Sequence, residues 1–154
     1  MKKYVKQFAV ILCIAAVLLA LSAVLRGATG TSDVARTLKK SWAVELPGGY
    51  VVEYRAASDE KMEEGGLRFH VLLYEDGAAL DDLLPWVPSS QTTGKVESGA
   101  EAAAEMLTAL RVPGGEWPDL EAASMWYADD DEGAEILIFH AAEDLRLYIL
   151  ESFS

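Results

Sequence analysis

An uncharged, apolar run from Phe8 to Leu25 most constrains this chain, because it decides on which side of a membrane the rest can fold. As an α-helix, its eighteen residues would extend about 27 Å at about 1.5 Å per residue, close to the roughly 30 Å hydrocarbon core of a bilayer. Basic residues flank the run: Lys2, Lys3 and Lys6 before it and Arg26 after it. Basic flanks favour the cytoplasm, and the lysine-rich start is the more basic of the two. We therefore expect the N-terminus inside and the C-terminal part outside the cell membrane.

The chain is therefore expected to have four parts. These are a cytoplasmic basic N-terminus (1–7), a transmembrane signal-anchor helix (8–25), a linker (26–32) and an extracytoplasmic domain (33–154). The small, polar stretch Gly27 to Ser32 reads as a tether that holds the domain within roughly 15 Å of the bilayer.

A cleaved signal peptide is the alternative interpretation of the same run. Small residues at Ala20, Ser22 and Ala23 suit a signal peptidase, and a cut near Ser22 would give a secreted protein. The run continues through Leu25 without the polar stretch that usually precedes cleavage, which favours an uncleaved anchor.

The charge is distributed unevenly along the chain. Residues 1–26 carry four basic and no acidic side chains, whereas the rest carries nine basic and all 25 acidic residues, a formal charge of −16. Such a charge repels the phosphates of nucleic acid and argues against close docking on anionic lipid headgroups. It permits cationic partners, and it also keeps an exported domain soluble.

About 120 residues follow the linker, enough for one domain with one core. The only cysteine, Cys13, lies in the apolar run, so ordinary packing must hold the domain together. Four tryptophans, with several Tyr and Phe, supply large apolar surfaces for that core.

Periodicity predicts the elements of the first half of this domain. Val34 and Leu38 indicate a helix within 33–40, and alternation indicates a short strand over 42–46 that ends at Pro47. Two further alternating runs, 50–56 and 67–74, should pair as antiparallel strands joined by the polar loop from Ser58 to Gly66.

Sequence patterns in the second half of the domain predict two helices and three strands. A short helix over 78–84 precedes an extended segment, 85–88, and Ser98 with Glu101 forms a capping-box pattern where the main helix should begin. Three β-type runs follow as an antiparallel meander: 123–128, 134–141 and 145–153. The middle run is apolar on both faces, so a helix should cover it. The expected fold is α+β, with a mostly antiparallel sheet in the order ββ-α-βββ and one main packing helix, preceded by a single transmembrane helix.

The densest charge cluster, Asp129 to Glu132, is the candidate for cation binding. Clustered carboxylates suit Ca²⁺, but Gly133 stands at the fifth position counted from Asp129, where an EF-hand loop needs glycine at the sixth. A solvated hairpin turn is the better interpretation, with Asp129 and Asp131 kept as metal candidates. No cofactor is expected.

Histidines and nucleophiles form no catalytic constellation. His70 and His140 are the only histidines, and no third metal ligand or nucleophile stands at informative spacing near either. His70 shares the predicted face of Arg68, the wetter one, and His140 follows Ile136 and Ile138. Both are interpreted as structural or surface residues, and we assign no catalytic residue.

The candidate binding surface comprises four residues: Glu63, Glu64, Trp86 and Trp117. The two glutamates lie in the Ser58 to Gly66 loop. Trp86 stands close to Pro85 and Pro88, and Trp117 precedes Pro118, so both could form a ligand-facing aromatic rim. Such tryptophans more often close the edge of a small core.

Three C-terminal segments carry a resemblance to a known group: Met125 to Asp130, Ile136 to His140 and Leu145 to Glu151. They resemble the ending of small, single-pass, uncharacterised bacterial envelope proteins with a C-terminal β-meander, and Leu84 to Pro88 is similar to a Trp-Pro segment in them. Those proteins carry a His- and Gly-rich acidic loop after the first strand, whereas Ser58 to Gly66 contains no histidine. Because the group has no known activity, the resemblance implies a location and an architecture but no catalytic residue.

Two classes of function follow from these observations. The first is a membrane-tethered binding or interaction module that acts on a protein, peptide or envelope component. The alternative is a small envelope hydrolase whose paired carboxylates come from Glu63, Glu64 and the Asp129 run. Burial separates them, since a catalytic carboxylate should lie in a pocket that raises its pKa.

Overall fold

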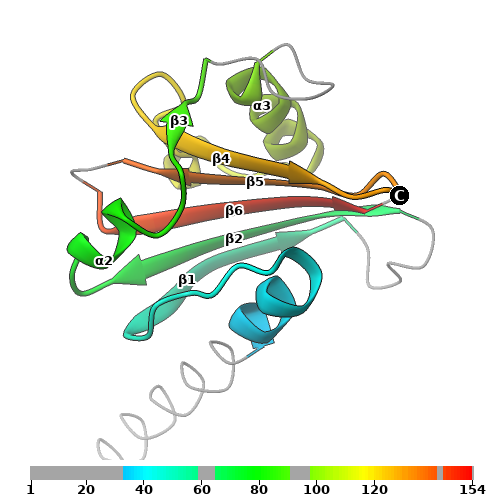
Figure 1. Cartoon of the computed structure of the whole chain (residues 1–154). Helices are drawn as coiled ribbons and strands as arrows, with labels where there is room; N and C mark the ends of the chain where they lie inside the picture. The colour runs from blue at the N-terminus through cyan, green and yellow to red at the C-terminus, as the bar shows by residue number, and fades with distance from the viewer. Residues whose placement is uncertain (1–32, 59–64, 91–97, 142–143, 154) are drawn as a thin grey trace, which may run out of the picture.

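The centre of the molecule is an antiparallel β-sheet of six strands, seen in a computed structural model (Figure 1). The structure describes residues 33–58, 65–90, 98–141 and 144–153. The strands are β1 (Tyr50–Ala57), β2 (Gly66–Tyr74), β3 (Val87–Pro88), β4 (Ser124–Asp129), β5 (Glu135–His140) and β6 (Arg146–Phe153). The helices are a segment over 33–42, α2 (Ala78–Asp81), α3 (Gly99–Ala109) and the 3-10 turn η1 (Gly114–Glu116). The expected α+β class with a mostly antiparallel sheet is confirmed.

The strand order is β1-β2-β6-β5-β4-β3. The predicted hairpin pairs β1 with β2, and the predicted meander runs β4, β5, β6. The last strand, β6, also pairs with β2 and so joins the two units into one sheet. This register places Arg55 opposite His70, and Arg68 opposite Glu151.

Both faces of the sheet are covered, which gives three layers. On one face, α3 contributes Ala103 and Leu107 to a core with Phe69 and Phe139. On the other face, the 33–42 helix and α2 cover a second core that includes Ile138, and Figure 1 shows α3 and the 33–42 helix on opposite sides of the strands. Since β5 is buried along nearly its whole length, the prediction of a central strand under a helix is confirmed.

The helix over 33–42 confirms one prediction and corrects another. Val34 and Leu38 face the core as expected, but the strand predicted over 42–46 is wrong: Trp42 still belongs to the helix, and residues 43–47 have no regular structure. Trp42 falls four residues after Leu38, so it continues the helical face. Ala43 then ends the helix with a φ of 55° in the left-handed region.

The other two helices form where expected, with different ends. The α2 helix stops at Asp81 rather than at the predicted residue 84. Ser98 is the N-cap of α3, but no side-chain capping bond forms, so the predicted capping box is absent. The amide of Ala100 instead donates to the carbonyl of Ser89 at 3.1 Å, which satisfies a free donor of the first turn.

The N-terminal predictions lie outside the described residues. These are the 1–7 segment, the 8–25 anchor, the 26–32 linker and the cleavage site near Ser22. In the part of the chain that the structure describes, no helix is both long enough and apolar enough to cross a membrane.

Candidate functional site

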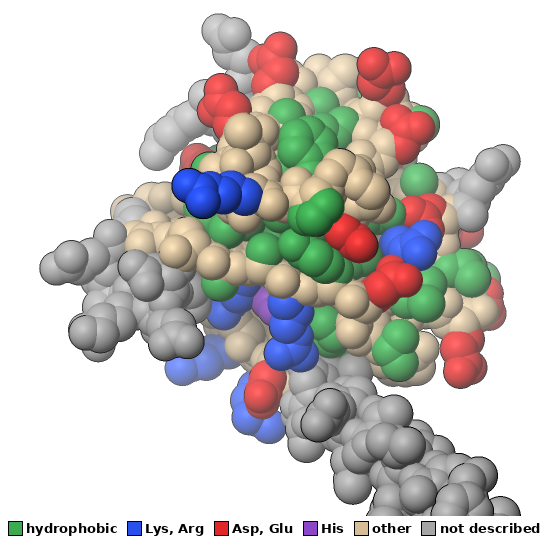
Figure 2. Space-filling model, turned by 180° about the vertical axis from the view of Figure 1, so that it is seen from behind, with side chains coloured by type: hydrophobic (Ala, Val, Ile, Leu, Met, Phe, Trp, Pro, Cys, Tyr) green, Lys and Arg blue, Asp and Glu red, His purple; other side chains and the backbone are tan. Residues whose placement is uncertain are grey.

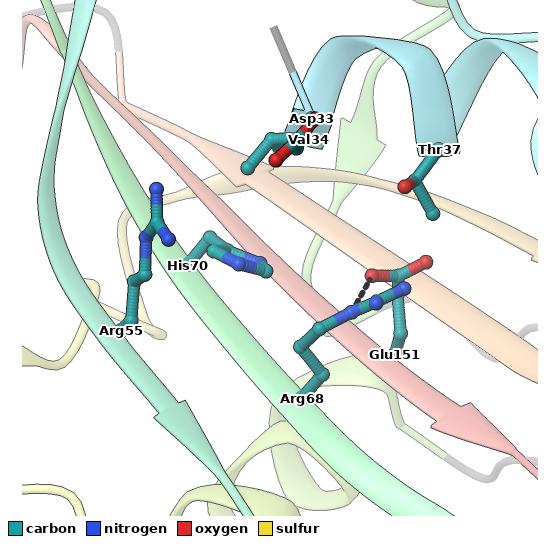
Figure 3. A pocket seen from close by; sticks show the side chains of 7 residues that line it. All are labelled: Asp33, Val34, Thr37, Arg55, Arg68, His70 and Glu151. Carbon is teal, nitrogen blue, oxygen red and sulfur yellow. Dashed lines mark hydrogen bonds and ion pairs between the residues drawn. The ribbon is translucent and has the colours of Figure 1, made fainter. Parts of the chain in front are cut away.

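A pocket of about 200 Å³ opens between the 33–42 helix and the sheet (Figure 3). We call it the arginine pocket. The strands provide its floor and the helix its opposite wall, and the residues that line it are Asp33, Val34, Thr37, Arg55, Arg68, His70 and Glu151.

Strand alternation brings the polar side chains of β1, β2 and β6 together. Arg68 and His70 are two apart on β2, so they share one face, and cross-strand pairing puts Arg55 and Glu151 beside them. This is the face that the 33–42 helix covers. His70 was predicted on the wetter face beside Arg68; it shares that face, but it is only 8% exposed.

Glu151 is a buried carboxylate with both oxygens engaged. Its side chain is 2% exposed. Arg68 Nε donates to Oε2 at 2.8 Å, and the indole Nε1 of Trp42 donates to Oε1 at 2.9 Å. The Arg68 guanidinium also lies 4.8 Å from the centre of the Phe153 ring. Glu151 therefore links β2 and β6 to the helix that forms the upper wall of the pocket.

His70 is buried without a complete set of hydrogen bonds. Its Nδ1 atom has no partner among the described residues. Burial, together with the nearby positive charges of Arg68 and Arg55, lowers the pKa of His70 to about 4. The ring is therefore neutral near pH 7, with one nitrogen as a donor and the other as an acceptor.

Arg55 brings a positive charge to the pocket that no described residue neutralises through a hydrogen bond or ion pair. It stands opposite His70 in the register, and Figure 3 shows its guanidinium beside the His70 ring. An arginine in this position is available to an anionic group from outside.

Positive charge gathers around the pocket although the domain is acidic. Of the seven basic residues in the described part of the chain, five lie in the 33–42 helix, β1 or β2. They are Arg36, Lys39, Lys40, Arg55 and Arg68. Figure 2 shows basic side chains on both sides of a histidine at this part of the surface. The net charge does not reveal this local concentration of basic residues, because it averages over the whole surface.

Of the four residues of the predicted binding surface, the structure describes Trp86 and Trp117 and does not bring these two together. Glu63 and Glu64 lie outside the described residues. Trp86 and Trp117 pack beside different cores, on opposite faces of the sheet, and their indole N–H groups donate to the carbonyls of Leu80 and Val112 at 2.8 and 3.0 Å. These positions fit tryptophans that close the edge of a core.

The predicted metal candidates lie on an exposed turn between β4 and β5. Asp130 Oδ1 accepts hydrogen bonds from the amides of Glu132 and Ala134 at 3.0 and 2.8 Å, which organises the turn. Asp129 and Asp131 are exposed. Across the described ranges, no group of three or more His, Cys, Asp or Glu residues is placed to hold a metal ion.

His140 lies apart from the arginine pocket. It is 3% exposed, its Nε2 lies 3.2 Å from Asp81 Oδ1, and its ring centre is 5.7 Å from that of Trp86. It thus fastens α2 against the sheet, while β6 separates its strand from that of His70.

Sequence reasoning missed Glu151 as a site residue. A signal was present, since Glu151 interrupts the apolar face that Leu147 and Ile149 begin on the same strand. A charge on such a face needs a buried partner. Identifying Arg68 as that partner required the pairing of β2 with β6.

Comparisons with models of known families, with curated proteins and with solved structures find no match for this chain. The case for a function therefore depends on the pocket itself.

Proposed function

We propose that this chain is a membrane-tethered binding module that takes a ligand from a protein, peptide or envelope component in the arginine pocket. The observation that carries the proposal is the pocket itself, in which Arg55 lines the wall beside the buried His70 and has no ion-pair partner among the described residues. An arginine that stands free at a pocket is a ready donor to an anionic ligand group.

The acidic residues near the pocket favour binding over hydrolysis. Asp33 and Glu151 both line it. Both oxygens of Glu151 already accept hydrogen bonds, and the Asp33 side chain is 73% exposed and paired with Arg36 at 3.4 Å. Neither carboxylate has the buried, unpaired state that a general acid needs. The acids of the β4–β5 turn are exposed and do not line the pocket.

The proposed location comes from the N-terminal segment. An anchor over 8–25 with lysines before it and a short linker after it would hold the domain close outside the bilayer. A reporter fused after Ser154 should be active only outside the cytoplasm, and activity in the cytoplasm would refute this location.

Site-specific photo-cross-linking tests binding at the pocket. A photoreactive residue at Thr37, which lines the pocket, should give a discrete adduct when the full chain is in its native membrane. The same residue at Glu105, on the exposed side of α3, should not give that adduct. Equal adducts from both positions, or none from Thr37, would contradict the proposal.

A further inference from the structure

We propose that the arginine pocket binds a single carboxylate group, held by Arg55 and by the outer edge of Arg68. This inference deepens the proposed function and depends on it, because it names the chemical class of ligand at the same pocket.

The balance of charges in the pocket calls for one negative charge. Glu151 neutralises Arg68, and Asp33 is paired with Arg36 outside the pocket floor. Arg55 remains without an ion-pair partner among the described residues. Arg55 is exposed, so its charge is solvated without a ligand and is free to pair with a monoanion that enters the pocket.

The geometry of the two arginines suits a carboxylate. Arg55 and Arg68 are diagonal neighbours on adjacent strands, because Arg55 stands opposite His70 and Arg68 is two residues from His70. Diagonal neighbours in a sheet are roughly 7–8 Å apart, and Figure 3 shows His70 between the two arginine side chains, so the space over His70 has one arginine on each side. Glu151 occupies Arg68 Nε only, so the terminal Nη groups keep their donors for a second acceptor. An arginine fork matches the two oxygens of a carboxylate.

A phosphate dianion suits the pocket less well. Glu151 is paired with Arg68 and Asp33 with Arg36, so a second negative charge on the ligand would find no further free cation among the described residues that line the pocket. His70 adds no compensating charge near pH 7, because its pKa is lowered to about 4 by burial and by the neighbouring arginines.

The volume limits what enters. A pocket of about 200 Å³ has room for six or seven water molecules at about 30 Å³ each. It therefore accommodates a small organic acid, or one carboxylate at the end or on a side chain of a larger molecule whose remainder stays outside.

Titration with propionate tests the inference, with propionamide as its neutral isostere and inorganic phosphate as the dianionic competitor. The readout is the set of His70 ring signals in NMR spectra of the full chain in detergent micelles. Propionate should shift these signals saturably and more strongly than either other probe. Arg55→Gln should weaken propionate binding about tenfold or more, since it removes a charged donor. Arg111→Gln, the matched loss of an exposed arginine after α3, should leave it unchanged. Thermal unfolding of both variants checks that they are folded.

The possible outcomes separate this inference from the proposed function. Equal binding of propionamide, or tighter binding of phosphate, would overturn the carboxylate while a Thr37 adduct still upheld a binding pocket. Saturable propionate shifts that survive Arg55→Gln would overturn the assigned role of Arg55. No shift with any probe would also overturn the carboxylate, and the cross-link would then decide the binding function.

Discussion

Replacement of Glu151 with leucine should destabilise the fold more than any surface change. The substitution removes the partner of Arg68, whose side chain is only 19% exposed, and it leaves the Trp42 indole N–H without an acceptor. Removing one partner of a buried ion pair costs about 3–5 kcal/mol. Because Arg68 keeps some access to solvent, we take about 3 kcal/mol for the pair and about 1 kcal/mol for the indole, about 4 kcal/mol in total.

Thermal unfolding of the full chain in micelles, followed by near-ultraviolet circular dichroism, measures this loss. For a domain of about 120 residues, 1 kcal/mol corresponds to about 3–5 °C, so Tm should fall by roughly 12–20 °C. Glu105→Leu, an exposed position on α3, is the matched control and should change the free energy of unfolding by less than about 0.5 kcal/mol.

The double variant Glu151→Leu with Arg68→Leu tests the physical reason. With both charges gone, apolar packing should recover most of the loss, because no buried cation is left unpaired. The reasoning is refuted if Glu151→Leu costs less than about 1 kcal/mol, or if the double variant is as unstable as the two single losses added together.

Three further predictions concern glycine packing, pH and the acidic turn. Gly99→Ala should cost about 1–2 kcal/mol in urea unfolding, because a Cβ there would lie within 2.6 Å of the buried end of Met125, whereas Gly114→Ala, which meets open space, should be neutral. Lowering the pH from 6.5 to about 4 should remove up to about 3 kcal/mol of stability, because the unfolded chain protonates His70 while the folded chain, with its lowered pKa of about 4, does not. His70→Gln should flatten that part of the profile, and an unchanged slope would contradict the burial argument. Asp130→Ala should cost about 1 kcal/mol through its two lost amide bonds, and Asp131→Ala should cost less than half of that.

Local patterns predicted the elements better than their arrangement. Alternating side chains indicated β1 and β2, and three apolar runs separated by polar breaks indicated the C-terminal meander. The pairing of β2 with β6 joins residues such as Arg68 and Glu151 that are 83 positions apart, and no local pattern encodes that distance. It follows instead from the need to bury the apolar faces of both units together.

The error at Trp42 has a specific origin. Trp42 alternates with Val44 and Leu46 as in a strand, and it also stands four residues after Leu38 as in a helix. Both periods fit the same residue, so periodicity alone does not decide between them. The helical position wins because it places the indole N–H on Glu151.

The candidate site was the least predictable feature. His70 and Arg68 were recognised as sharing a face, but the pocket needs Arg55, Glu151 and the 33–42 helix as well. Together with Arg68 and His70, these come from four separate parts of the chain: the 33–42 helix, β1, β2 and β6. Charge averaged over the sequence also hid the basic surroundings of the pocket, since 25 acidic residues outweigh the few basic ones that converge there.

The most direct test of the central claim is the yield of the cross-linked adduct from Thr37 in the native membrane, with and without Arg55. Arg55→Gln should reduce this yield strongly, because Arg55 supplies a pocket charge that has no ion-pair partner among the described residues and is available to the ligand. Lys40→Gln removes the same charge from the neighbouring helix without touching the pocket lining, and it should leave the yield unchanged. Equal yields from the intact chain and Arg55→Gln would contradict the role of Arg55, and no discrete adduct from Thr37 in either would contradict a binding function for the arginine pocket.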